Sequence, residues 1–122
     1  MDHISLGRRG EDAAVRYLLG EGWAILGRNV RHGRGEVDII AASGDVVAFV
    51  EVKSRTGRDH GHPLEAITWA KRREVARVAR GWLRGQAGLG GRIFRFDAVS
   101  VSYFGKGPPE ILHVPDAWRL GS

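Results

Sequence analysis

The 122-residue chain contains no cysteine. This absence excludes a disulfide scaffold, cysteine-ligated zinc and a catalytic thiol, and it fits a reducing compartment such as the cytoplasm, where we expect the protein. Apolar runs are short, and none approaches the roughly 18 consecutive residues that span a bilayer. The first nine residues, MDHISLGRR, become charged where a secretion signal would become apolar. We therefore expect neither a signal sequence nor a membrane partner.

Lysine is also scarce, because arginine supplies sixteen of the nineteen cationic side chains. The net charge is +5 and the isoelectric point is about 10.4, which favours polyanionic partners such as nucleic acid. An arginine excess beside eighteen glycines is also what a GC-rich coding sequence produces. The positions of the arginines are therefore more informative than their number.

Length and a hydrophobic content of 43% favour one domain with a real core, spanning residues 1–122. The pattern predicts an α/β fold in which a mixed sheet of about five strands is flanked by helices, in the order α-β-β-β-α-β-β. The predicted elements are residues 5–22, 23–26, 36–41, 46–53, 63–84, 93–103 and 111–114. Residues 29–34, which are basic, and residues 56–62 are typical of glycine-bearing loops.

The two strands at 36–41 and 46–53 predict an antiparallel hairpin that carries acidic residues. With a two-residue tip at Ser43-Gly44, Glu36 faces Glu51, and Asp38 becomes a diagonal neighbour of Glu51, with Cα atoms roughly 7–8 Å apart. Lys53 then lies on the same face as these acids. A slip of one residue would move Glu51 to the opposite face, so the grouping depends on an even-length turn.

Two interpretations of these acids stay open. The strands are otherwise apolar, and burying acids among apolar residues is unfavourable unless they are paired or bind a metal. A divalent cation between Asp38 and Glu51 would satisfy them. Alternatively, Glu51 and Lys53 form a salt bridge, while Glu36 and Asp38 are solvated at a strand end.

At these residues the chain resembles the PD-(D/E)XK nuclease superfamily, through Asp38 and the Glu51-Val52-Lys53 element. It is more closely similar to the YraN-like family of endonuclease-related proteins. The matching segments are residues 6–14 (LGRRGEDAA), 35–40 (GEVDII), 49–55 (FVEVKSR) and 95–97 (RFD). The superfamily's proline before the aspartate is absent, because Val37 stands there. Glu11 resembles the acid that Holliday-junction resolvases of the superfamily carry before the core.

The resemblance implies a restriction-endonuclease-like fold and phosphodiester hydrolysis with Mg²⁺ or Mn²⁺. Asp38, Glu51, Lys53 and Glu11 would be the catalytic residues. The metal ligands would be Asp38, Glu51, the Val52 carbonyl and Glu36, since hard oxygen ligands suit these cations. Glu11 is equally explained as an acid favoured by a helix N-terminus, and Glu36 as a solvated acid at the sheet edge.

Nucleic-acid contacts are expected from basic and hydroxyl side chains near these motifs. The candidates are Arg8, Arg9, Arg34, Ser54, Arg55, Lys71, Arg73 and Arg77. Arg73, Arg77, Arg80 and Arg84 form one stripe on the predicted second helix, and a solvated helix face explains such a stripe as well. His60 and His62 lack a third ligand nearby, so we do not expect a zinc site there.

The leading hypothesis is a Mg²⁺-dependent endonuclease acting on DNA, with branched or single-stranded DNA as expected substrates. The alternative is a nucleic-acid-binding module of the same fold with little or no catalysis. A third interpretation is a basic structural protein whose acidic cluster is a salt-bridge network. The resemblance to resolvases, which cut two strands symmetrically, also implies a homodimer.

Overall fold

The computed structural model describes residues 3–57 and 61–119 of the chain. Its elements are α1 (His3–Gly20), β1 (Ala24–His32), β2 (Gly35–Ser43), β3 (Val46–Thr56), the 3₁₀ helix η1 (Pro63–Ala66), α2 (Trp69–Arg84), β4 (Ile93–Tyr103) and β5 (Glu110–Trp118). The strands form one sheet in the order β1-β2-β3-β4-β5. Only the β3–β4 pair is parallel, which makes the sheet mixed. The predicted α/β class, strand number and element order are confirmed.

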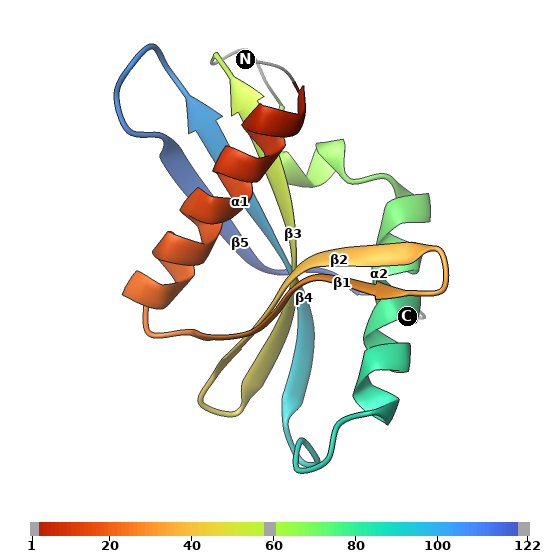
Figure 1. Cartoon of the computed structure of the whole chain (residues 1–122). Coiled ribbons are helices and arrows are strands. Elements are labelled where there is room, and N and C mark those ends of the chain that lie inside the picture. The colour runs from red at the N-terminus through yellow and green to blue at the C-terminus, as the bar shows by residue number, and fades with distance from the viewer. Residues whose placement is uncertain (1–2, 58–60, 120–122) are drawn as a thin grey trace.

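The sheet is strongly twisted, and a helix covers each of its faces (Figure 1). On one face, Ala13, Ala14 and Leu18 of α1 pack on Ile39 and Val50. On the other face, Val75 and Val78 of α2 pack on Ile40, Phe49 and Ala98. β2 and β3 are therefore covered on both sides, as their continuous apolar runs predict.

The first strand differs from its prediction. Residues 29–32, expected in a loop, belong to β1, which pairs with β2 as far as His32↔Gly35. β1 is an edge strand whose second half is mostly exposed, so its side chains do not show the alternation that identifies a half-buried strand. Asn29 also has a φ of 50°, which interrupts the extended backbone.

The β2–β3 turn lies one residue later than predicted, which shifts the pairing of the two strands by two residues. Ser43 pairs with Val46, so Gly44 and Asp45 form the tip. Gly44 has a φ of 56°, and the first position of a type II′ hairpin turn requires a positive φ. A shift of two preserves the alternation of the paired residues, and the hairpin still places Asp38 and Glu51 on adjacent strands.

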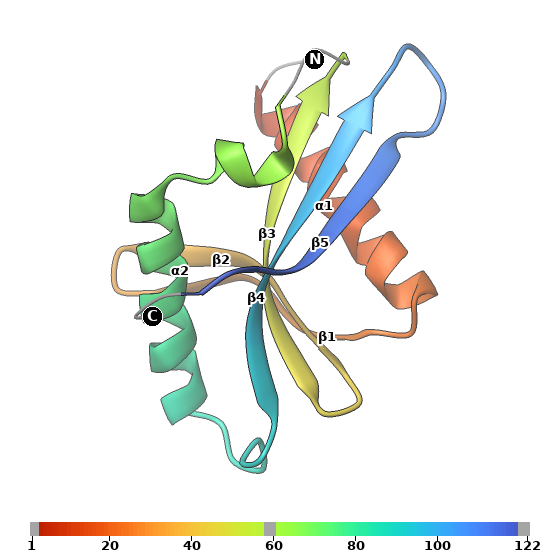
Figure 2. The same ribbon diagram turned by 180° about the vertical axis from the view of Figure 1, so that it is seen from behind.

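The predicted helix over residues 63–84 is divided in two. Ile67 is extended, with φ −103° and ψ 105°, and ends η1. The hydroxyl of Thr68 accepts a hydrogen bond from the Lys71 N–H at 3.1 Å and caps the start of α2. Figure 2 shows η1 on the face of the sheet opposite α1, and η1 contacts β4 and β5. Residues 58–60, part of the predicted loop before η1, lie outside the described residues.

The close approach of α1 to β3 fixes the position of Glu11. A Cβ added to Gly10 would lie 1.7 Å from the Ser54 hydroxyl oxygen, so only glycine allows this contact. The next residue of α1 is Glu11, which this contact holds close to the end of the hairpin.

Candidate functional site

Asp38 and Glu51 meet where β2 and β3 pass between the two helices. The last pair of the β2–β3 ladder is Ile39↔Val50, the immediate chain neighbours of these two acids. Glu51 is only 2% exposed, while Asp38 is half-buried. One carboxylate oxygen of Asp38, Oδ2, accepts a hydrogen bond from the Val52 backbone N–H at 2.8 Å. The acids are thus brought together, as the sequence predicts.

The buried carboxyl group of Glu51 is in an electrostatically unfavourable environment. Burial first, and then the negative charge and hydrogen bonding of Asp38, raise the pKa of Glu51 to about 9. Its Oε1 is buried and has no hydrogen-bond partner among the described residues. A buried oxygen without a partner is costly, and a bound cation would relieve both the repulsion and the unmet acceptor.

Two lysines lie close to the acids. The charges of both Lys53 and Lys71 act on Glu51, and the Nζ of Lys71 lies 3.8 Å from its Oε2. Lys71 Nζ also donates to Glu74 Oε2 at 2.7 Å and to the Glu36 carbonyl at 3.3 Å. Burial opposes the charged form of Lys71, but the hydrogen bond to Glu74 and the charge of Glu51 outweigh it and raise the pKa of Lys71.

Glu74 is a further residue of this cluster that was not among the predicted site residues. Its side chain also accepts a hydrogen bond from the Glu36 N–H at 3.2 Å, so it joins the start of β2 to α2. The hydrogen bond from Lys71 lowers the pKa of Glu74. The spacing i, i+3 from Lys71 on a predicted helix was the available sequence signal.

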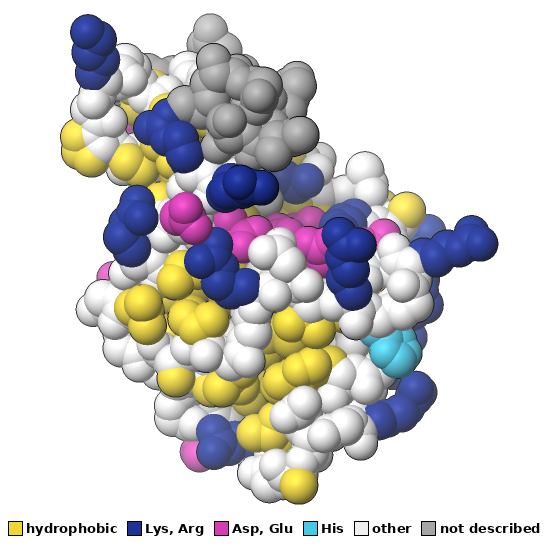
Figure 3. Space-filling model, viewed as in Figure 1, with side chains coloured by type: hydrophobic (Ala, Val, Ile, Leu, Met, Phe, Trp, Pro, Cys, Tyr) yellow, Lys and Arg dark blue, Asp and Glu magenta, His cyan; other side chains and the backbone are white. Residues whose placement is uncertain are grey.

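A pocket of about 380 Å³, called here the acidic pocket, opens beside Asp38 on the α1 side of the hairpin. It is lined by Leu6, Gly7, Glu11, Asn29, Glu36, Asp38, Val52, Lys53 and Ser54. All of these residues except Asn29 belong to the motif segments at residues 6–14, 35–40 and 49–55. Figure 3 shows acidic side chains gathered in a band on this face, with Lys and Arg side chains around it.

Two acids of this pocket already have partners. Glu11 Oε1 accepts hydrogen bonds from Arg28, at 2.9 and 3.1 Å, and from the Asn29 side chain at 2.9 Å. Glu36 forms an ion pair with Arg31 at 3.2 Å. In the part of the chain that is described, no group of three His, Asp or Glu side chains is placed to hold a metal ion. The candidate metal ligands are therefore centred on Asp38 and Glu51, with Glu11 and Glu36 at the periphery.

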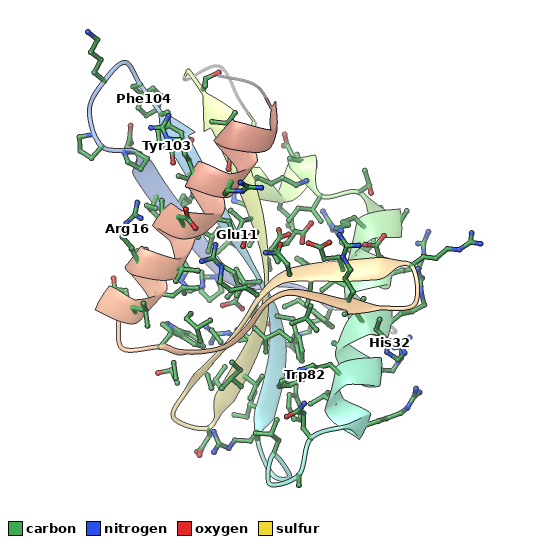
Figure 4. All side chains as sticks on the ribbon, in the orientation of Figure 1. Glu11, Arg16, His32, Trp82, Tyr103 and Phe104 are labelled. Carbon is green, nitrogen blue, oxygen red and sulfur yellow. The ribbon has the colours of Figure 1, made fainter. Side chains whose placement is uncertain are left out.

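The predicted nucleic-acid residues fall into separate groups. Arg34, at the β1–β2 turn, lines a pocket of about 540 Å³ together with the arginine stripe of α2; we call it the basic pocket. Its lining is His32, Gly33, Arg34, Gly35, Glu74, Arg77, Val78, Arg80 and Arg84. His32 lies against α2 over Gly81, where a Cβ would come within 2.4–2.5 Å of the ring (Figure 4). Arg34 of the β1–β2 turn and the arginines of α2 therefore line the same pocket.

The remaining basic candidates are dispersed. Arg8 and Arg73 are exposed, and the Arg9 guanidinium lies 4.7 Å from the ring centre of Tyr103. Ser54 packs against Gly10 at the wall of the acidic pocket. Arg55 donates to the Gly61 carbonyl at 2.6 Å and to the Ser100 hydroxyl at 3.3 Å.

His62 has a local structural role. Its Nδ1 accepts a hydrogen bond from the Leu64 N–H at 3.2 Å at the start of η1, while His60 lies outside the described residues.

None of the helices in the described part of the chain is long and apolar enough to cross a membrane.

Asp97 is the centre of a buried polar network that the sequence pattern does not predict. Asp97 is fully buried and accepts hydrogen bonds from Arg95 at 2.9 and 3.1 Å and from the Asp116 N–H at 2.9 Å. His113 Nε2 lies 2.7 Å from Asp97, and its Nδ1 lies 3.2 Å from the Tyr17 hydroxyl. Burial opposes ionisation of Asp97, but the hydrogen bonds to His113 and Arg95 outweigh it and lower its pKa. The network joins α1, β4 and β5.

Comparison with known proteins gives one consistent family. The sequence model of the uncharacterised protein family UPF0102 matches residues 10–101. A UPF0102 protein of Rhodococcus opacus is 47% identical over 117 residues, which cover 95% of this chain and 98% of the relative. A UPF0102 protein of Geobacter metallireducens is 42% identical over 116 residues, covering 95% and 93% of the two chains.

Proposed function

The chain belongs to the uncharacterised protein family UPF0102, and we propose that it is a metal-dependent endonuclease that hydrolyses phosphodiester bonds in DNA. One observation carries the proposal. Glu51 is buried against Asp38 with an unpartnered oxygen and a pKa raised to about 9, and two lysines lie within range of its charge. Pairs of carboxylates forced together in this way are characteristic of functional sites.

Asp38 and Glu51 are the residues that would hold Mg²⁺ or Mn²⁺, with the Val52 carbonyl as a further oxygen ligand. The carboxylate oxygens of Asp38 and Glu51 are suitable ligands for such a cation, and Oε1 of Glu51 has no hydrogen-bond partner among the described residues. Bound there, the cation supplies Lewis-acid activation of the phosphate and of a water molecule. Glu11, whose Oε1 is held by Arg28 and Asn29, lies close enough to line the same pocket and contributes through water.

Lys53 and Lys71 supply positive charge at the same place. Lys53 lines the acidic pocket beside Asp38, where its ammonium group would stabilise the charge that develops on the phosphate during hydrolysis. Lys71 sits between Glu51 and Glu74, which holds it close to the acid pair. A phosphate approaching the acids thus meets two cations rather than bare negative charge.

The basic pocket supports a nucleic-acid substrate. Its lining includes the side chains of Arg34, Arg77, Arg80 and Arg84. It also includes Glu74, which accepts the hydrogen bond from Lys71. A phosphate backbone lying along α2 would therefore pass directly beside the acid pair, and its binding would weaken with salt.

One observation favours the alternative, a nucleic-acid-binding module without catalysis. In the described residues, only two carboxylates converge closely and no third metal-binding side chain joins them. The two functions share the basic surface and differ in whether strands are cut.

A cleavage assay separates them. We expect the purified protein, with Mg²⁺ or Mn²⁺, to cut at least one substrate in a panel of single-stranded, branched and duplex DNA. Glu51→Gln, Asp38→Asn and Lys53→Ala should each lower the rate by at least 100-fold, on the scale of lost electrostatic stabilisation. Glu21→Gln, an equal charge change at the exposed end of α1, serves as the matched control. Binding without cutting by the wild type would establish the alternative, and full activity in Glu51→Gln would reject the site.

A further inference from the structure

A third pocket lies further along β3 from Glu51, between β3, β5 and η1. It has a volume of about 660 Å³, against about 380 Å³ for the acidic pocket. We call it the η1-side pocket. Its polar lining is Arg55, His62, Ser100, Ser102 and Glu110, and its apolar lining includes Pro63, Phe104, Ile111 and Leu112.

The strand register connects this pocket to the acid pair. Side chains alternate between the faces of a strand, so Glu51, Lys53 and Arg55 of β3 share one face. On the neighbouring strand, Ser100 pairs with Lys53 and Ser102 pairs with Arg55. Glu51 and Arg55 are four residues apart, which is about 13 Å along a strand. The pocket is therefore within reach of a nucleotide next to a phosphate held at the acid pair.

The Arg55 guanidinium is fixed on the wall of the pocket. It donates to the Gly61 carbonyl at 2.6 Å and to the Ser100 hydroxyl at 3.3 Å. Its Nε is buried and has no hydrogen-bond partner among the described residues. A planar guanidinium held in this way stacks well on an aromatic base, and its unmet donor would be satisfied by an acceptor on a ligand.

The apolar wall favours a base over a free phosphate. Leu112 is 49% exposed, a large apolar side chain left open to solvent, and Ile111 and Phe104 lie next to it in the pocket lining. Figure 4 shows Phe104 at the end of β4 beside Tyr103. Glu110, opposite Ser102 in the β4–β5 ladder, places a carboxylate at the pocket.

The volume also fits. Small-molecule sites typically occupy about 300–1,000 Å³, with mostly apolar walls and a few fixed polar groups. A base in a duplex is stacked and paired and cannot enter such a pocket without being extruded, whereas an unpaired base can.

We propose that the η1-side pocket receives one unpaired base of a nucleic-acid strand whose neighbouring phosphate lies at Asp38 and Glu51. This inference rests on the proposed function and specifies it, because it makes the substrate a single strand or a strand with an unpaired nucleotide. Arg55 and the apolar wall hold the base, and Ser100 and Ser102 supply hydroxyls to its edge.

The test compares three fluorescein-labelled probes in EDTA, where no cleavage occurs, at low salt. They are oligo(dT) of twelve nucleotides, an abasic deoxyribose-phosphate chain of the same length, and a twelve-base-pair duplex. We expect the wild type to bind oligo(dT) about tenfold more tightly than the abasic chain, because stacking one base contributes about 1–3 kcal/mol.

Two variants of the pocket should abolish this preference. Ser102→Phe fills the pocket, and Leu112→Glu places a charge on its exposed apolar wall without altering the core. Leu26→Glu is the matched control, because Leu26 is 42% exposed on β1 and lines none of the pockets described above. The readout is the ratio of the affinity for oligo(dT) to the affinity for the abasic chain. A general weakening of binding by added negative charge does not change this ratio.

The outcomes are distinct. An unchanged preference for oligo(dT) in both pocket variants, or no preference in the wild type, overturns the pocket assignment while leaving the nuclease proposal to its cleavage assay. Failure of the wild type to bind any of the three probes also overturns the pocket assignment, and the cleavage assay then decides the nuclease proposal. Loss of the preference in Ser102→Phe and Leu112→Glu, with Leu26→Glu unchanged, supports the inference.

Discussion

Asp38 and Glu51 lie beside each other on β2 and β3, yet their oxygens are satisfied differently. Asp38 accepts a backbone hydrogen bond from Val52, whereas the Oε1 of Glu51 is buried without a partner. Burial of Glu51, together with the charge of Asp38 beside it, raises the pKa of Glu51 to about 9. The fold thus holds an acid pair that is unfavourable by itself and that a cation would stabilise.

This raised pKa predicts a pH dependence of stability. A glutamate in the unfolded chain titrates near pH 4.3, so between about pH 5 and pH 9 the folded state retains a proton that the unfolded state has lost. In EDTA, the wild type should lose stability as the pH rises through this window, by at most roughly 1.4 kcal/mol per pH unit. Urea unfolding at pH 6, 7 and 8 measures the slope. Glu51→Gln cannot ionise and should show a shallower slope, whereas Glu21→Gln should retain that of the wild type; equal slopes in all three proteins would contradict this account.

The contact between Gly10 and Ser54 predicts a matched pair of glycine substitutions in α1. Gly10→Ala places a Cβ against the Ser54 side chain and should destabilise the protein by about 1–3 kcal/mol through overpacking. Gly7→Ala meets nothing within 4 Å and should be stabilising by up to about 1 kcal/mol, because alanine favours a helix. Thermal or urea unfolding compares the two. Equal effects would show that α1 does not pack on β3 in this way.

Asp97 should be important for stability rather than for catalysis. Asp97→Asn removes the charge that pairs with Arg95 and His113 in a fully buried position, and should destabilise the fold by about 3–5 kcal/mol. Asp116→Asn is the control, because Asp116 is exposed and asparagine tolerates its φ of 50°. Its unfolding midpoint should stay close to that of the wild type. A wild-type midpoint in Asp97→Asn would show that the network does not stabilise the fold.

The basic pocket predicts the salt dependence of nucleic-acid binding. Arg77→Gln should weaken binding to single-stranded and duplex DNA alike, and should reduce the slope of log affinity against log salt by about one. Arg119→Gln is the comparison, because Arg119 is exposed, pairs with Asp116 and lines none of the pockets described above. Anisotropy titrations at several salt concentrations measure both slopes. A slope for Arg77→Gln equal to that of Arg119→Gln would place the phosphate contacts elsewhere.

The sequence predicted the parts of the fold in which local pattern and burial agree. β4 was predicted with its observed bounds, Ile93–Tyr103, because its side chains alternate between two buried faces. The face shared by Asp38 and Glu51 was also predicted, since a register error of two residues at Gly44 preserves the faces of a strand.

The features that were missed depend on tertiary contacts. The second half of β1 is polar at the sheet edge and pairs through its backbone, so its side chains give no signal. His113 and Asp97 are 16 residues apart and meet only because β4 and β5 pair.

The break at Ile67, in contrast, could have been predicted from the sequence, because Thr68 is a good N-cap for a helix that begins at Trp69.

The most direct test of the central claim is calorimetric titration of the metal-free protein with Mn²⁺. We expect the wild type to bind Mn²⁺, Asp38→Asn and Glu51→Gln to lose that binding, and Glu21→Gln to bind as the wild type does. Absence of binding in the wild type, or equal binding in all four proteins, would show that Asp38 and Glu51 do not form a metal site.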